Sequence, residues 1–142
     1  MIKHVRTLRA LADENRLRLL LLLRRRELFV CQLMAVLKLS QPLVSRNLAL
    51  LDREGLLDSR RQGKHVFYRL KKDPPRLVSV LLDITAADEW FDRDRRNMEL
   101  FCRDFLGGAE CDMRAVKAFI QFQGKNKNGG AKYGKTGQKR VY

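Results

Sequence analysis

The feature that most constrains this chain is a three-residue connector, Lys38-Leu39-Ser40, between two short stretches with the apolar spacing of helices. The first stretch runs from about Val30 to Lys38. The second is expected to begin at Ser40, whose hydroxyl can cap a helix, with Pro42 in the first turn, where the missing N–H of proline has no cost. A connector this short forces the two helices to pack against each other, which predicts a helix-turn-helix.

The pattern around this pair predicts a mainly α-helical chain with one small β-hairpin. The helix after the connector is expected to reach Glu54, stop at Gly55 and bury Val44, Leu48 and Leu51. Further helices are expected at residues 2–11, at residues 13–26 with Asp13 as the cap, and from about residue 76 through Phe105 to a break at Gly107-Gly108, followed by an amphipathic piece with Met113, Val116, Phe119 and Ile120. Between residues 58 and 70 the apolar period changes to two, which predicts a hairpin with its turn at Gln62-Gly63. In this order the elements predict a winged helix-turn-helix.

The charge balance narrows the choice of partner. Thirty Lys and Arg face sixteen Asp and Glu, which gives a net charge of +14 and a pI near 10.4. An excess of this size favours nucleic acid first and an anionic membrane surface second. Residues 124–142 contribute six of these cations and no acid, so +8 remains on the rest of the chain. The Lys, Gly and Asn content of that last stretch predicts a disordered tail.

The helix that starts at Ser40 can lie in the major groove of duplex DNA, with its first two turns facing the bases. Arginine suits guanine and an amide side chain suits adenine, whereas cations at a hairpin tip suit phosphate or a narrow minor groove. The predicted DNA contacts are Ser40, Gln41, Ser45, Arg46 and Asn47 on the helix, and Arg60, Arg61 and Lys64 on the hairpin. A solvated helix face or a protein-docking domain would account for each feature singly, but their order and the net charge together favour DNA binding.

A family resemblance extends over about residues 5–70, in the segments ALADENRLRLLLLL, ELFVCQL, LSQPLVSRNLALLDREGLL and RRQGKHVFYRL. These segments resemble the ArsR/SmtB family of bacterial metal- and metalloid-responsive repressors. The resemblance implies a homodimer, with the first and fifth helices at the interface, that binds double-stranded operator DNA and releases it when an inducer ion binds. The chain departs from the family pattern at Leu43, where Thr or another small residue is common, and at Asn47, where His is common. The predicted domains are a winged-helix DNA-binding and dimerisation domain at 1–106, a helical extension at 107–123 and the basic tail at 124–142.

The cysteines are the candidate ligands for an effector. In the arsenic-responsive branch of the family, the third helix carries a stretch resembling ELCVCDL, whose thiolates hold trivalent arsenic or antimony. Here the stretch is ELFVCQLM, in which Phe29 replaces the first cysteine, Cys31 keeps the second and Met34 follows. One thiol does not hold a soft trivalent metalloid. Cys102 and Cys111 could complete a three-thiolate site for As(III) or Sb(III), from one or both subunits. Alternatively, these two form a reversible disulfide, or all three are buried packing residues.

Other chemistries have less support in the sequence. Zinc-sensing relatives place His and carboxylates on the fifth helix, but this chain has no His after residue 65. The acidic cluster from Asp88 to Asp94 is interleaved with arginines, which is typical of a solvated helix face. An enzyme is not expected, because the chain has no glycine-rich phosphate loop and no catalytic triad with credible spacing. The apolar run from Leu19 to Leu23 is too short for a signal peptide or a membrane span, so the chain is expected to be cytoplasmic.

The function predicted from the sequence is a DNA-binding transcriptional repressor that needs no cofactor to bind DNA and is released by a thiophilic metalloid such as arsenite or antimonite. Two alternatives remain open. One is a winged-helix regulator with an incomplete metalloid site that responds to redox or to a small molecule. The other is a basic nucleic-acid-binding domain without sequence preference.

Overall fold

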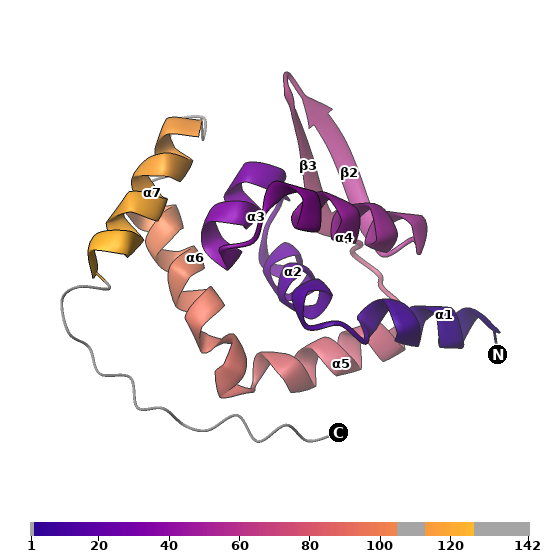
Figure 1. The fold of residues 1–142 in the computed structure, drawn as a ribbon. Helices are drawn as coiled ribbons and strands as arrows, with labels where there is room; N and C mark the ends of the chain where they lie inside the picture. The colour runs from indigo at the N-terminus through magenta and orange to yellow at the C-terminus, as the bar shows by residue number, and fades with distance from the viewer. Residues whose placement is uncertain (1, 105–112, 127–142) are drawn as a thin grey trace.

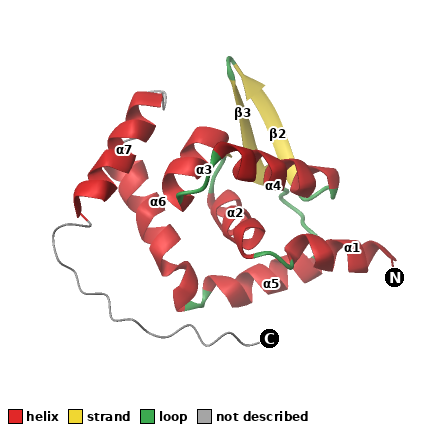
Figure 2. Cartoon of the chain, viewed as in Figure 1, coloured by secondary structure: helices red, strands yellow, loops and turns green. Residues whose placement is uncertain are grey.

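Helices make up most of the chain, with one small sheet (Figures 1 and 2). The computed structural model describes residues 2–104 and 113–126. The helices are α1 (Ile2–Leu11), α2 (Glu14–Arg25), α3 (Val30–Leu37), α4 (Gln41–Arg53), α5 (Arg76–Ala86), the 3-10 turn η1 (Glu89–Phe91), α6 (Asp92–Asp104) and α7 (Met113–Asn126), and the strands are β1 (Leu28–Phe29), β2 (Leu57–Gln62) and β3 (His65–Leu70). The predicted class, mainly α with a small hairpin, is confirmed.

Helix α2 is the centre of the fold. Asp13 caps it by accepting a hydrogen bond from the backbone N–H of Arg16 at 3.0 Å, as predicted. The five consecutive leucines from Leu19 to Leu23 are all at most 2% exposed. A helix that is apolar on every side must be surrounded by other elements. Accordingly, α2 contacts α1, α3, α4, α5, α6 and β3 (Figure 1).

The predicted helix-turn-helix consists of α3 and α4. Gln32 closes the first turn of α3 by accepting a hydrogen bond from the Phe29 backbone N–H at 3.0 Å. The C-cap of α3 is Lys38, which has the left-handed conformation with φ 56° and so lets the chain turn sharply within the connector. Helix α4 begins at Gln41 with Ser40 at its N-cap position, but the hydrogen bond predicted for the Ser40 hydroxyl is not formed.

The sheet has three antiparallel strands in the order β1-β3-β2. Strands β2 and β3 form the predicted hairpin, here called the wing (residues 57–70). Gln62 pairs with His65, so Gly63 and Lys64 form the turn, and the predicted turn at Gln62-Gly63 is wrong by one residue. Gly63 has a φ of +59°, a conformation that glycine adopts without strain. Strand β1 has no counterpart in the sequence-based prediction, because two residues are too few to show a period.

The prediction of one long fifth helix is wrong. Helix α5 ends at Ala86, and Asp88 has an extended backbone (φ −76°, ψ 138°) that begins η1. The ring of Phe91, which is 1% exposed, then enters the core, and α6 continues in a new direction along α3 (Figure 1). Helical spacing alone does not reveal such a break, because the burial of Phe91 depends on distant parts of the chain. Phe105, Gly107 and Gly108 lie outside the described residues.

One buried ion pair joins α6 to the helix-turn-helix. Arg18 of α2 donates two hydrogen bonds to the carboxylate of Asp94, at 2.7 and 2.9 Å, and a third to the backbone carbonyl of Leu37 at 2.8 Å. The side chain of Asp94 is 5% exposed. The expectation that the whole acidic cluster faces solvent is therefore wrong for Asp94, although Asp92 does pair with Arg95 on the helix surface.

Helix α7 packs on α3 and buries two residues of its predicted apolar face, whereas a third, Ile120, is 49% exposed. Val116 and Phe119 are at most 1% exposed, and the Phe119 ring meets that of Phe101 edge to face, with their centroids 5.1 Å apart. The helix runs to Asn126, so residues 124–126 belong to it and not to the predicted tail. The rest of that predicted tail, residues 127–142, lies outside the described part of the chain.

Apolar side chains remain exposed on α1 and α5. Ile2, Val5 and Leu8 on α1 are 79%, 44% and 48% exposed, and Val80 and Ile84 on α5 are 46% and 60% exposed. Large apolar side chains gathered on neighbouring elements are typical of a surface that binds another protein. Within the described ranges, no helix is long and apolar enough to cross a membrane.

Candidate nucleic-acid interface

The N-terminal half of α4 presents polar side chains on a firmly anchored helix. Val44 and Leu48 are at most 1% exposed and fix the inner face. Because the helix repeats every 3.6 residues, the positions between these buried residues include several that point outward. Four of the predicted contacts are exposed there, namely Ser40, Gln41, Ser45 and Arg46. A row of amide, hydroxyl and guanidinium groups at the start of such a helix has the donors and acceptors needed to read base edges in a major groove.

Asn47, which was predicted as a DNA contact, is not part of this row because its side chain is buried. The residue is 7% exposed and its Oδ1 accepts a hydrogen bond from Arg16 Nη1 at 3.5 Å. Its position explains the difference: Asn47 follows Val44 by three residues and precedes Leu51 by four, which places it on the inner face of the helix. Its Nδ2 is buried without a hydrogen-bond partner.

Arg16 is a positioning residue that the sequence analysis missed. Its guanidinium donates to the backbone carbonyls of Arg9, at 3.1 Å, and Ala10, and so satisfies the last turn of α1 while Nη1 reaches Asn47. One side chain thereby joins α1, α2 and α4. The signal was present in the sequence, because Arg16 and Arg18 flank Leu17 just before the leucine run of α2, where a partly buried arginine needs a specific partner.

The wing places two of its three predicted cations in solvent. Arg61 and Lys64 are exposed at its tip, and neither forms an ion pair within the described residues. Arg60 is engaged by the protein itself. It pairs with both carboxylate oxygens of Glu27 and lies over the ring of Phe67, 4.7 Å from the centroid. Arg60 therefore braces the wing within the protein, and its contact with DNA stays a prediction.

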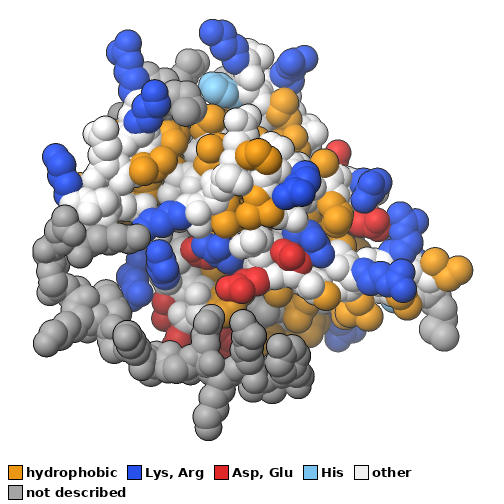
Figure 3. All heavy atoms as spheres, viewed as in Figure 1, with side chains coloured by type: hydrophobic (Ala, Val, Ile, Leu, Met, Phe, Trp, Pro, Cys, Tyr) orange, Lys and Arg blue, Asp and Glu red, His pale blue; other side chains and the backbone are white. Residues whose placement is uncertain are grey.

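Positive charge dominates the end of the molecule that carries the wing. Figure 3 shows Lys and Arg side chains projecting around this end, while the acidic side chains of the same face lie mostly lower down. Phosphate contacts draw their affinity from surface cations of this kind. The arrangement suits a polyanion that covers α4 and the wing together.

The cysteines do not form a metal site within the described residues. No group of three or more His, Cys, Asp or Glu side chains that could hold a metal ion occurs in residues 2–104 and 113–126. Cys31 is half-buried in the first turn of α3, and burial raises the pKa of its thiol. Cys102 is half-buried on α6, and its Sγ lies 2.6 Å from Arg26 Nη1. Cys111 lies outside the described residues.

Phe29, which replaces the first cysteine of the ELCVCDL-like stretch, is a core residue. It is 4% exposed, its ring stacks on His65 with a centroid distance of 4.3 Å, and it meets Phe67 edge to face at 5.1 Å. These contacts tie the start of α3 to the wing. An aromatic ring thus takes the place where the arsenic-responsive branch has a thiolate.

Comparison with known proteins agrees with this geometry. The family described as bacterial regulatory protein, arsR family, matches residues 13–59. The arsenic resistance transcriptional regulator ArsR1 of Pseudomonas putida is 44% identical over 89 residues, which cover 61% of this chain and 70% of that protein. Among solved structures, reduced HlyU from Vibrio cholerae is 37% identical with a TM-score of 0.52, covering 58% of this chain and 84% of that one. The homodimeric winged helix-turn-helix domain of Mb0332 from Mycobacterium bovis is 29% identical with a TM-score of 0.54, covering 59% and 79%.

Proposed function

This chain belongs to the arsR family of bacterial regulatory proteins, and from that membership we propose that it is a transcriptional repressor that binds operator DNA as a homodimer. The observation that carries the proposal is the exposure of Gln41, Ser45 and Arg46 on a helix whose opposite face is completely buried. Arg46 pairs with guanine, Gln41 with adenine, and Ser45 with a base edge or a phosphate. Arg61 and Lys64 hold the flanking phosphates.

The homodimer forms through the exposed apolar side chains of α1 and α5. Each copy buries these five side chains against the other copy, which supplies the hydrophobic core that a stable interface needs. The homodimeric state named for the Mycobacterium bovis domain supports this assembly. Two-fold symmetry then presents two copies of α4 to successive major grooves, about 34–36 Å apart along the duplex, so the operator is an inverted repeat.

The inducer in this proposal is a trivalent metalloid, arsenite or antimonite, bound by thiolates of Cys31, Cys102 and Cys111. The names of arsenic resistance regulators among the relatives support this choice. Cys31 and Cys102 lie on α3 and α6, which pack against each other. Because α3 leads directly into the connector before α4, a bound ion that shifts α3 would also shift α4 and so lower the affinity for DNA.

A redox signal is the second candidate effector. The Arg26 guanidinium lies against Cys102 Sγ, and cysteines in electropositive, partly exposed surroundings are the ones that react readily. Hydrogen peroxide would take two electrons and two protons from the thiols of Cys102 and Cys111, which gives a disulfide and two molecules of water, and this disulfide would link the end of α6 to the segment that follows it.

Operator recognition is tested by fluorescence anisotropy with a palindromic duplex, selected from random sequence by the full chain, against a scrambled duplex over a salt series. We expect a clear preference for the palindrome and a steep salt dependence from about 6–10 phosphate contacts per dimer. Arg46→Ala should weaken the preference by about 1–3 kcal/mol. Arg53→Ala, at the other end of α4, is the matched control, and Asn47→Ala should leave base preference intact. Equal affinity for both duplexes would instead support a non-specific basic domain.

The effector is tested by titrating arsenite into the protein–DNA complex. Release by the unmodified chain, reduced in Cys102→Ser and Cys111→Ser, is the expected result. If arsenite fails and peroxide releases the complex in a manner that needs Cys102, the redox candidate replaces the metalloid.

A further inference from the structure

A pocket lies where α1 passes the C-terminal end of α4 (Figure 1). It has a volume of about 670 Å³, and sites for small molecules in proteins usually measure roughly 300–1,000 Å³. Charged side chains line it from three segments, namely α1, the end of α4 and the stretch between β3 and α5: Lys3, Arg6, Arg53, Glu54, Lys71 and Asp73. We call it the α1–α4 pocket. None of the roles proposed above uses these side chains.

The walls of the α1–α4 pocket are held in place by the protein itself. Arg6 Nη2 on α1 lies 3.2 Å from Glu54 Oε1 at the C-cap of α4, and this ion pair joins two of the walls. The third wall is tied to the same place, because the Lys71 N–H donates a hydrogen bond to the Leu56 carbonyl at 3.1 Å. A ligand that binds between walls already in place loses less free energy to ordering them.

Positive charge in this pocket exceeds negative charge. Apart from the ion pair just described, the pocket has three cations, Lys3, Arg53 and Lys71, and one carboxylate, Asp73. All four side chains are exposed, and none of them forms an ion pair within the described residues. Three cations against one carboxylate leave two positive charges uncompensated, and like charges around one pocket repel each other. An anion with at least two negative charges removes this repulsion.

The pocket borders the exposed apolar face of α1. Ile2 belongs to that face and also lines the pocket, whereas Lys3 follows it by one residue and so points about 100° away around the helix. Arg53 and Lys71 lie outside α1 and α5 altogether. We therefore expect a homodimer formed through the apolar side chains of α1 and α5 to leave the pocket accessible at its rim.

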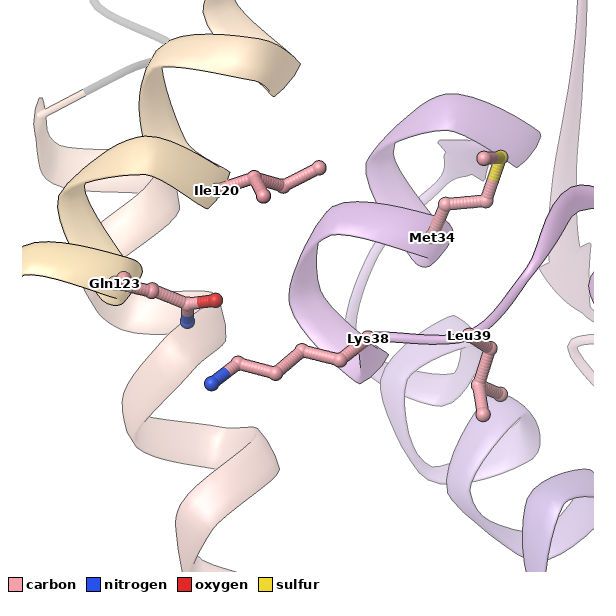
Figure 4. A pocket seen from close by; sticks show the side chains of 6 residues that line it. Met34, Lys38, Leu39, Ile120 and Gln123 are labelled. Atoms are coloured by element: carbon pink, nitrogen blue, oxygen red, sulfur yellow. The ribbon is translucent and has the colours of Figure 1, made fainter. Parts of the chain in front are cut away.

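The pocket shown in Figure 4, between α3 and α7, differs in kind. It is smaller, at about 320 Å³, and Met34, Leu39 and Ile120 give it apolar walls. Lys38, the cation among its lining residues, already has an interaction within the protein. The charge available to an anion therefore lies in the α1–α4 pocket and not in this one.

The side chains around the α1–α4 pocket select phosphate groups. A guanidinium binds two phosphate oxygens at once, and an ammonium binds phosphate as a point charge. Two linked phosphates provide the charge that the pocket lacks and enough oxygen atoms to meet cations from separate walls. We propose that the α1–α4 pocket binds a small molecule that carries a diphosphate group, held by Lys3, Arg53 and Lys71. This proposal does not depend on the function proposed above.

Binding is tested by calorimetry on the full chain, without DNA or divalent cations, with pyrophosphate and orthophosphate as probes at equal ionic strength. We expect pyrophosphate to bind with a dissociation constant on the order of 0.1–1 mM, and orthophosphate about tenfold more weakly, because it has less charge and reaches fewer cations. Pyrophosphate should also raise the thermal midpoint. Neither heat nor a shift of the midpoint at several millimolar, or equal affinity for the two probes, would overturn the proposal.

Paired variants locate the probe. Arg53→Ala/Lys71→Ala should weaken pyrophosphate binding at least about tenfold, because it removes two of the three cations that hold the probe. Arg61→Ala/Lys64→Ala, at the tip of the wing, lowers the net charge by the same amount and should change the affinity less than about twofold. All four side chains are exposed, so both variants should keep the fold. If the wing variant weakens the probe as much as the pocket variant does, or more, the assignment to the α1–α4 pocket is wrong.

Asp73 gives a test of the opposite sign. Asp73→Asn removes a carboxylate from the pocket and should strengthen pyrophosphate binding about two- to threefold. Asp58→Asn, an exposed change on β2 outside the pocket, raises the net charge equally and should have no such effect. Equal effects of the two changes would show that the probe responds to net charge and not to this pocket, which contradicts the proposal.

DNA is the other source of phosphate for these cations, and the salt dependence of binding to the selected palindrome separates the two sources. If the pocket serves a small molecule, Arg53→Ala/Lys71→Ala leaves the salt slope unchanged, whereas Arg61→Ala/Lys64→Ala lowers it by about two per chain. A drop of that size in the pocket variant would assign its cations to DNA and overturn the proposal. If the chain binds no DNA, the proposed function fails, and the calorimetry still decides whether the pocket binds a diphosphate group.

Discussion

Replacing Asp94 by Ala should destabilise the fold far more than its place in a charged helix suggests. The side chain of Asp94 is 5% exposed and that of its partner Arg18 is 19% exposed. Removing one partner of a fully buried ion pair costs about 3–5 kcal/mol, because the other charge stays buried and unpaired. Arg18 keeps Asn15 and the Leu37 carbonyl as acceptors and some contact with water, so we expect about 2–3 kcal/mol.

The measurement is urea denaturation at one fixed protein concentration, because subunit association also adds to the free energy of unfolding. Asp92→Ala is the matched control: Asp92 lies two residues earlier on α6 and pairs with Arg95 on the surface. A loss below about 1 kcal/mol is expected for it. The double variant Arg18→Met/Asp94→Leu should regain most of the lost stability, since apolar side chains replace both buried charges. If Asp94→Ala and Asp92→Ala behave alike, the buried pair does not stabilise the fold as argued.

Three further outcomes follow from the geometry. In the wing, Arg61→Ala should reduce the salt slope of DNA binding by about one per chain. Arg60→Ala should change this slope less, because Arg60 already pairs with Glu27. Equal changes in the two variants would show that Arg60 also contacts phosphate. Burial raises the pKa of Cys31, so in a Cys102→Ser/Cys111→Ser variant the pH midpoint of its alkylation by iodoacetamide should be higher in the folded chain than in the same variant unfolded by urea. The folded chain holds this proton more tightly, so the free energy of unfolding should fall as pH rises through the same interval, and a lower midpoint in the folded chain would contradict the argument. Gly55 has a φ of +73° with open space around it, so Gly55→Ala should destabilise the fold by about 1 kcal/mol from the backbone alone. Gly124→Ala, in a helix, should be neutral or stabilising. If both changes shift the thermal midpoint in the same direction, this explanation is excluded.

The parts of the fold that depend on local pattern could be predicted from the sequence. Asp13 caps α2, the connector at Lys38 turns the chain, and Val44, Leu48 and Leu51 face inward, because each depends on spacing or on a residue's own preference. The exposure of four predicted DNA contacts on α4 follows from the same spacing.

What could not be predicted depends on residues far apart in the chain. The break after α5 depends on a place in the core for Phe91, and the burial of Asp94 depends on Arg18, 76 residues earlier. Asn47 shows a different kind of error, since its residue type suits DNA while its helical position faces inward. The position of Asn47 in the helix predicts its burial better than its residue type does, because Val44 and Leu51 on the same face were already predicted to be buried.

The break between α5 and α6 also determines where α6 and α7 lie in the fold. An unbroken helix over residues 76–104 would be about 43 Å long and would carry its far end away from the body. Instead α6 turns away from the direction of α5 and runs along α3, and α7 packs beside the turn that leads into α4. A substitution in α7 therefore acts next to the connector that leads into α4, and not on a remote part of the chain.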